Sequence, residues 1–183
     1  PQINDRVVFI SDVRTAKQCD TCQEQNVFSV NALEQAVFRL YGPMAGGQVL
    51  QRNLRSHSFE ELQALLDQNP EVDYADLDSN LKQAQWIIFS LLNVSTSNPT
   101  SEALSNFLAL RPDLYRQKKI VVFAFDAPYL LDETEISKLN AYYGLYSRTP
   151  QFIEIAARLL FGELPSPPGS LPVSVTGVDY DLI

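Results

Sequence analysis

Almost uninterrupted apolar runs alternate with stretches of helical periodicity along the chain. The two longest runs are WIIFSLL at residues 86–92 and IVVFAF at residues 120–125. Uniform apolarity of this kind is typical of central parallel strands, because helices cover both of their faces. Further strands are expected at RVVFI (6–10), QVLQRNL (48–54), AYYGLYS (141–147) and PVSV (172–175).

Helix signals fill the segments between these runs. Asn31 with Glu34, and Ser58 with Glu61, have the spacing of a capping box, which satisfies free backbone N–H groups at a helix start. Apolar residues then recur at helical spacing. They are Leu33, Val37 and Leu40, then Leu62, Leu65 and Leu66, then Leu77, Leu81 and Ala84, and then Leu104, Phe107 and Leu108.

A last helix is expected from Thr149 and Pro150, a cap followed by proline at the first helical position, to a left-handed stop at Gly162. Strands that alternate with helices predict a three-layer α/β sandwich, with helices on both faces of a mostly parallel five- or six-stranded sheet. The residues at 172–175 would add a C-terminal edge strand. No repeat and no Gly/Ser linker divides residues 1–183, so one domain is expected.

Composition narrows the classes of function. The net charge of −8 disfavours nucleic acid and anionic membrane surfaces as partners, since both need clustered Lys and Arg. No apolar run reaches the roughly 18 residues of a membrane span, and the start shows no targeting signal. The start at Pro1 without Met is typical of an excised or processed fragment. The compartment, exported or cytoplasmic, stays open.

Open parallel sheets bind ligands at the carboxyl ends of their strands. A phospho-acceptor switch domain would need clustered acids after the first strand, whereas Asp12 stands largely alone, and a Lys after the fifth, where Arg148 and Thr149 stand. A flavin or dinucleotide site needs a Gly-rich or Ser/Thr-rich turn after the first strand, but residues 10–17 contain no glycine. The glycines of residues 42–48 precede a strand and predict a plain loop. No cofactor is expected.

Cys19 and Cys22 form the motif CDTC. Two Cys and the single His57 cannot complete a four-ligand zinc site without carboxylates, so no metal is expected. A redox CxxC usually opens a helix, and here the next expected helix begins some nine residues later. A local disulfide and two unremarkable thiols are the remaining interpretations. His57 precedes a helix cap in a polar stretch, which indicates a surface position.

Two long segments carry a resemblance to a known family. KKIVVFAFDAPYLL (118–131) and YYGLYSRTPQFIEIAARLLFGELPSPPGSLPVSV (142–175) resemble the C-terminal α/β-sandwich domain of glycoside hydrolase family 3. The matching features are a small-Pro-aromatic turn after a buried strand, a helix that closes in LFG, and an arm with a Pro/Gly pair before an LP strand. The residues are Ala127, Pro128, Tyr129 and Leu130; Leu160, Phe161 and Gly162; and Pro168, Gly169, Leu171, Pro172 and Val173.

The resemblance implies that the catalytic groups lie elsewhere. In this family the nucleophilic Asp belongs to an N-terminal barrel, and in the glucosidase-like branch the acid/base Glu follows the third strand of the sandwich. Here that place holds Leu92 and Asn93. In the hexosaminidase-like branch the proton donor is a His–Asp pair on a barrel loop, so the departure favours that branch and leaves this chain without a catalytic residue.

The expected function is that of a non-catalytic module that packs on a barrel domain of the same polypeptide and contacts carbohydrate indirectly. The candidate sugar or domain-interface contacts are Asp126, Tyr129, Tyr142 and Tyr143. The alternative is a free-standing flavodoxin-like binding or regulatory module. A docking domain is expected to expose an apolar patch of several hundred Å², and a free-standing module is not.

Overall fold

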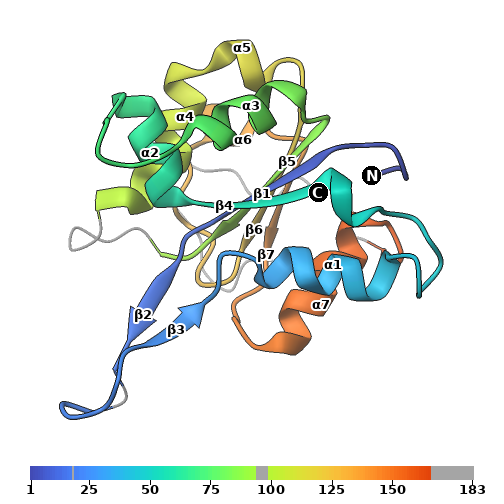
Figure 1. The fold of residues 1–183 in the computed structure, drawn as a ribbon, viewed down its shortest axis with the longest axis horizontal. Helices are drawn as coiled ribbons and strands as arrows, with labels where there is room; N and C mark the ends of the chain where they lie inside the picture. The colour runs from blue at the N-terminus through green and yellow to red at the C-terminus, as the bar shows by residue number, and fades with distance from the viewer. Residues whose placement is uncertain (18, 94–98, 166–183) are drawn as a thin grey trace.

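The computed structural model describes residues 1–17, 19–93 and 99–165 (Figure 1). At its centre lies a parallel sheet in the order β4-β1-β5-β6-β7. The strands are β1 (Val7–Ser11), β4 (Leu54–Ser58), β5 (Trp86–Leu91), β6 (Lys119–Ala124) and β7 (Ala141–Gly144). The expected C-terminal edge strand, with Gly169, Leu171 and Pro172, lies outside the described residues.

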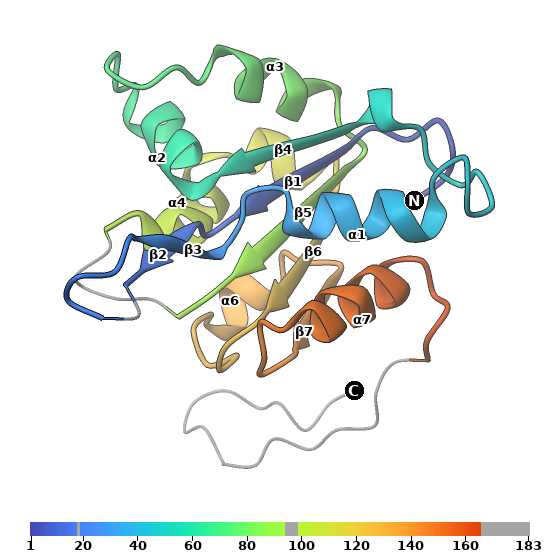
Figure 2. The same cartoon turned by 60° about the horizontal axis from the view of Figure 1, so that its bottom comes forward.

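Helices cover both faces of this sheet, so the expected three-layer α/β arrangement is confirmed (Figure 2). α1 and α7 pack on one face, and α2, α3 and α4 pack on the other. The helices are α1 (Ala32–Tyr41), α2 (Phe59–Asp67), α3 (Ala75–Gln83), α4 (Ala103–Leu110), α5 (Pro112–Tyr115), α6 (Glu133–Ile136) and α7 (Pro150–Leu160), with 3-10 turns η1 (Gln51–Asn53) and η2 (Pro99–Glu102). No helix within the described ranges has the length and apolarity to cross a membrane.

The two apolar runs form the middle of the sheet, as predicted. In β1, Val7 and Phe9 enter the cluster under α1 and α7, while Val8 and Ile10 enter the cluster under α2, α3 and α4. β5 and β6 alternate in the same way, and nearly all of their residues are buried. Because side chains of a strand point to opposite faces in turn, two helical layers require apolar residues at every position.

Of the two capping boxes predicted from the sequence, one forms and one does not. The capping box at Ser58 is present, since the Glu61 N–H donates to Ser58 Oγ at 3.1 Å and the Ser58 N–H donates to Glu61 Oε2 at 2.6 Å. The expected box at Asn31 is wrong, because Asn31 makes no side-chain cap hydrogen bond. Glu34 instead accepts a hydrogen bond from Ser56 Oγ on β4. A tertiary partner thus replaces the local one.

The strand expected at residues 48–54 is wrong. The chain there forms η1, and β4 begins only at Leu54. β4 is an edge strand whose residues alternate between buried and accessible, so it lacks the apolar run that marks β5 and β6.

The surface position expected for His57 is also wrong, because this residue lies in β4 and is only 7% exposed. The Asn80 side-chain amide donates to His57 Nε2 at 3.1 Å, and His57 Nδ1 lies 3.4 Å from Glu61 Oε2. Both partners come from the helices that cover this face of the edge strand. The residues next to His57 in the sequence are polar, so the sequence alone indicated an exposed position, whereas the fold buries this side chain.

An antiparallel hairpin separates β1 from α1 and was not expected from the sequence. Its strands are β2 (Arg14–Ala16) and β3 (Gln25–Phe28), and it extends away from the carboxyl end of β1 (Figures 1 and 2). Between them, Cys19 and Cys22 are joined by a disulfide, with their Cα atoms 5.1 Å apart. The strands are short and polar, which explains why no periodicity indicated them.

Candidate functional site

The crevice where an open parallel sheet usually binds ligands lies here between the carboxyl ends of β1 and β5. β1 is followed by α1 on one face, whereas β5 is followed by α4 on the other. The two connections diverge at this point, yet Ser11, Asp12 and Ser90 at the strand ends are fully buried. The residues that leave the two strands here are Asp12 and Asn93.

Arg14 spans this crevice. Its Nη2 lies 2.7 Å from Asp12 Oδ2, and its Nε donates to Asp12 Oδ1 at 3.3 Å. The same guanidinium donates to the side-chain oxygen and to the backbone carbonyl of Asn93. The Asp12 N–H donates to the carbonyl of Ser90 at 2.9 Å, so the two strand ends are joined by backbone and side-chain bonds.

Asp12 is wholly buried, which decides its protonation behaviour. Burial raises the pKa of Asp12, and the charge of Asp126 adds to the rise. The Arg14 guanidinium and the backbone of Leu92 lower the pKa, but burial prevails. A carboxyl with no exposed atoms contacts Arg14 and the strand ends rather than a substrate.

A second ion pair lies at the ends of β6 and β7. Arg148 Nε is 3.4 Å from Asp126 Oδ1, and the side chains are 41% and 25% exposed. The charge of Asp126 contributes to the raised pKa of Asp12, and both pairs lie at the carboxyl ends of the strands. We call Asp12, Arg14, Asn93, Asp126 and Arg148 the carboxyl-edge cluster.

The tyrosines predicted near this edge divide into two groups. Tyr129 lies at the edge, and its hydroxyl is 3.3 Å from the hydroxyl of Tyr146, which is 48% exposed and has φ of +58°. Tyr142 instead donates to the carbonyl of Pro128 at 2.8 Å. Tyr143 stacks on Phe123, with ring centroids 5.4 Å apart, on the face of the sheet that α1 and α7 cover.

Of the four candidate contacts, Asp126 and Tyr129 therefore lie at the carboxyl edge, while Tyr142 and Tyr143 are engaged in the packing of β7. The sequence reasoning did not select Arg14 and Arg148. A signal was available, because each arginine follows a strand end within four residues.

The accessibility of its carboxyl groups decides what the cluster can do chemically. Retaining glycoside hydrolysis needs two carboxyl groups about 5 Å apart with an open bond between them. Here both carboxylates are paired with arginines, and Asp12 is inaccessible. Within the described ranges, no group of three His, Cys, Asp or Glu residues has the arrangement of a metal site. Asp126, Arg148 and the two tyrosine hydroxyls offer acceptors and donors to polar groups.

No protein-family model matches the chain, and no curated protein sequence does. Among solved structures, it resembles a glycoside hydrolase family 3 β-N-acetylglucosaminidase from Paenibacillus sp. str. FPU-7, with 16% identity and a TM-score of 0.57 over 98% of this chain and 29% of that chain. The Mn²⁺-bound response regulator Rcp1 matches with 14% identity and a TM-score of 0.40, over 88% of this chain and 99% of that one. An apo NADH:FMN oxidoreductase matches with 13% identity and a TM-score of 0.45, over 90% and 92%.

The match to the glycoside hydrolase family 3 protein, at 16% identity, shows the fold and nothing finer. The chain spans less than a third of the length of the glycoside hydrolase family 3 protein. The chain thus has the fold of one part of a glycoside hydrolase family 3 protein.

Proposed function

We propose that this chain is a non-catalytic C-terminal module of a β-N-acetylhexosaminidase-like glycoside hydrolase family 3 protein. It packs on a barrel domain of the same polypeptide and helps to shape that domain's carbohydrate site. Support comes from the sequence pattern at residues 118–131 and 142–162, and from a shared fold over 98% of this chain.

The observation that carries the proposal is the pairing of charges in the carboxyl-edge cluster. Arg14 holds Asp12 in a buried position, so Asp126, paired with Arg148, is the one accessible carboxylate of the cluster, whereas retaining hydrolysis needs two. The accessible groups of Asp126, Arg148 and Tyr129 can form hydrogen bonds with sugar hydroxyls or with a neighbouring domain. Ion pairing fixes their positions.

The surface requires such an interface to be polar. The exposed large apolar side chains within the described residues come from five separate segments of the chain. They are Ile3, Val27, Met44, Leu110 and Tyr146. Interfaces between domains of one chain are more polar than obligate subunit interfaces, and the carboxyl-edge cluster would supply the polar contacts.

The order of the strands favours the alternative, a free-standing flavodoxin-like binding or regulatory module. The strand order β4-β1-β5-β6-β7 is the flavodoxin-like order. Such a module would not bind its ligand in the usual way, because Arg14 and its partners occupy the point between β1 and β5 where the connections diverge.

Hydrolysis by the chain itself is the first test. We expect no turnover of 4-nitrophenyl N-acetyl-β-D-glucosaminide or of the corresponding β-glucoside. Turnover that disappears in Asp126→Asn but persists in Asp113→Asn would overturn the non-catalytic assignment. Asp113 is a matched control, since it is an exposed carboxylate that pairs with Arg111 at 3.0 Å, remote in sequence from the cluster.

The coding region upstream of Pro1 is the second test. We expect a continuous reading frame that encodes eight β/α units, about 250 residues in a typical barrel. In that full protein, Asp126→Asn should raise KM for the sugar or weaken domain packing, while Asp113→Asn should change neither. A frame that encodes no barrel would overturn the module assignment and favour the free-standing alternative.

A further inference from the structure

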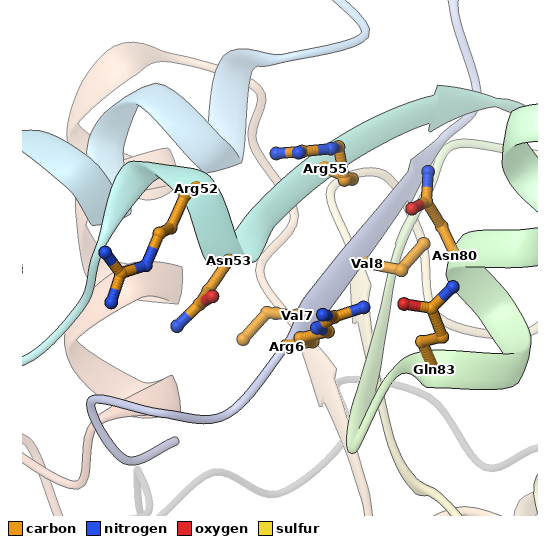
Figure 3. A pocket seen from close by; sticks show the side chains of 8 residues that line it. All are labelled: Arg6, Val7, Val8, Arg52, Asn53, Arg55, Asn80 and Gln83. Atoms are coloured by element: carbon orange, nitrogen blue, oxygen red, sulfur yellow. The ribbon is translucent and has the colours of Figure 1, made fainter.

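A cavity of about 220 Å³ opens at the amino ends of β1 and β4, at the edge of the sheet opposite the carboxyl-edge cluster (Figure 3). The polar residues that line it come from the position before β1, from η1, from β4 and from α3. They are Arg6, Arg52, Asn53, Arg55, Asn80 and Gln83. A volume of this size holds roughly seven waters at about 30 Å³ each, which suits a small molecule.

Strand register places two of these arginines on one face of the sheet. Val8 of β1 is paired with Arg55 of β4, and Arg6 lies two positions before Val8. Because side chains of a strand alternate between faces, Arg6 and Arg55 both project toward the layer that contains α3. Figure 3 shows Arg52 extending away from these two, so it lies at the rim.

The backbone of Arg6 is fixed at the cavity. Its N–H donates to Gln85 Oε1 at 2.7 Å, and its carbonyl accepts from the N–H groups of Gln85 and Trp86 at 3.0 and 3.2 Å. The guanidinium therefore extends from a rigid start. That preorganisation lowers the conformational cost of binding.

The positive charge at this edge is not neutralised by the protein. Among residues within the described ranges, no carboxylate forms an ion pair with Arg6, Arg52 or Arg55. The adjacent Asp5 carboxylate accepts hydrogen bonds from Trp86 Nε1 at 3.0 Å and from the Gln2 N–H at 2.8 Å. Both guanidinium groups are exposed, and Arg55 Nη1 donates to the carbonyl of Leu54 at 2.7 Å, so an anionic ligand would supply a counter-charge that the protein does not.

The α3 side of the cavity offers acceptors. The Asn80 side-chain nitrogen donates to His57 Nε2 at 3.1 Å, and the Gln83 side-chain nitrogen donates to Ser79 Oγ at 3.0 Å. The amide oxygens of Asn80 and Gln83 lie on the cavity side in Figure 3. An amide oxygen accepts hydrogen bonds from hydroxyl groups. The cavity thus has a cationic wall and an accepting wall.

We propose that this cavity binds a small organic phosphate that carries a free hydroxyl group. The guanidinium groups of Arg6 and Arg55 hold the phosphate, since their planar arrays of donors match its oxygens. The amide oxygens of Asn80 and Gln83 accept from the hydroxyl. This site lies at the other edge of the sheet and is independent of the function proposed above.

Binding of glycerol 3-phosphate, inorganic phosphate and glycerol to the chain, measured by calorimetry at low salt, tests the site. We expect saturable binding of both phosphates, tighter for glycerol 3-phosphate than for inorganic phosphate, and none of glycerol. Arg6→Gln and Arg55→Gln should each weaken phosphate binding at least tenfold. Arg116→Gln, which removes an exposed charge stacked on Tyr115, should leave it unchanged. No saturable binding of either phosphate, or equal weakening in all three variants, would overturn the proposal.

A second variant tests the accepting wall. Gln83→Ala should abolish the preference for glycerol 3-phosphate over inorganic phosphate while leaving the affinity for inorganic phosphate within twofold. Unfolding midpoints without ligand show whether the variant remains folded. A preference that persists in folded Gln83→Ala and also in folded Asn80→Ala would show that the hydroxyl assignment is wrong.

Discussion

At the carboxyl edge of the sheet arginines pair with carboxylates, whereas at the amino edge Arg6 and Arg55 are exposed and Arg55 donates to the carbonyl of Leu54. Arg14 and Arg148 are paired with Asp12 and Asp126. Arg6 and Arg55 have no such partner within the described residues. A chain with a net charge of −8 has enough carboxylates to pair every arginine, so composition does not impose the difference.

The difference separates two kinds of polar surface. Paired charges at the carboxyl edge hold strand ends together and fix the geometry of exposed donors and acceptors. At the amino edge the guanidinium groups of Arg6 and Arg55 are exposed, so they remain accessible to a ligand. The edge where ligands usually bind in this fold is therefore filled by the protein itself, and the cavity lies at the other edge.

Removal of the buried carboxylate should have the largest effect. Asp12→Ala leaves the Arg14 guanidinium, only 19% exposed, without its anion. We expect the free energy of unfolding to fall by about 2 to 3 kcal/mol. Urea unfolding measures the change, and Asp12→Asn is the control, since it keeps the shape and accepts one hydrogen bond. An equal loss in both variants would show that charge pairing alone, and not the cavity left by alanine, sets the cost.

A steric test of the same edge comes next in size. A Cβ at Gly144 would lie 2.7 Å from Cγ of the buried Pro128, whereas a Cβ at Gly162 would meet nothing within 4 Å. We expect Gly144→Ala to destabilise the fold by about 2 kcal/mol through overpacking. Gly162→Ala, at φ of +67°, should cost about 1 kcal/mol through backbone strain alone. Thermal unfolding measures the stability of both variants. A larger loss of stability in Gly162→Ala than in Gly144→Ala would contradict the close contact between Gly144 and Pro128.

The pH dependence of stability tests the balance at Asp12. Burial raises its pKa above the unfolded value of about 3.9. The folded state then binds the proton more tightly, so this contribution is fully present below the unfolded pKa and is lost as pH rises through the folded pKa. The free energy of unfolding of the wild type minus that of Asp12→Asn should fall as the pH rises above the unfolded pKa of about 3.9. A difference that rises with pH would show that Arg14 outweighs burial.

Relief of repulsion at the amino edge should give the smallest effect. Arg6→Gln or Arg55→Gln should raise the free energy of unfolding by a few tenths of a kcal/mol at low salt, and the gain should vanish near 1 M salt because counterions screen exposed charges. Arg148→Gln, which breaks an ion pair, should change stability in the opposite direction. A loss of stability in Arg6→Gln would show that the Arg6 charge has a stabilising partner in the folded protein.

The sequence predicted the sheet where burial on both faces produced a readable pattern. β5 and β6 match their apolar runs almost residue for residue, and Ser58 forms its capping box with Glu61. β4 was displaced, because an edge strand with accessible residues carries no such run. The β2–β3 hairpin was not predicted, because its short strands also lack an apolar run. Asp126 and Tyr129 were placed correctly at the carboxyl edge, since both follow a strand whose end was well defined.

The sequence alone determined the alternation of strands and helices and the identity of the central strands, because local periodicity records which side chains must be buried. The tertiary structure decided which charges meet. Arg14 donates to Asn93, which lies 79 positions away in the sequence. Glu34 accepts a hydrogen bond from Ser56 on β4 instead of capping its own helix. Such partners depend on strand order and register, which no local pattern records. For that reason only the folded chain distinguishes an edge of paired charges from an edge of unpaired ones.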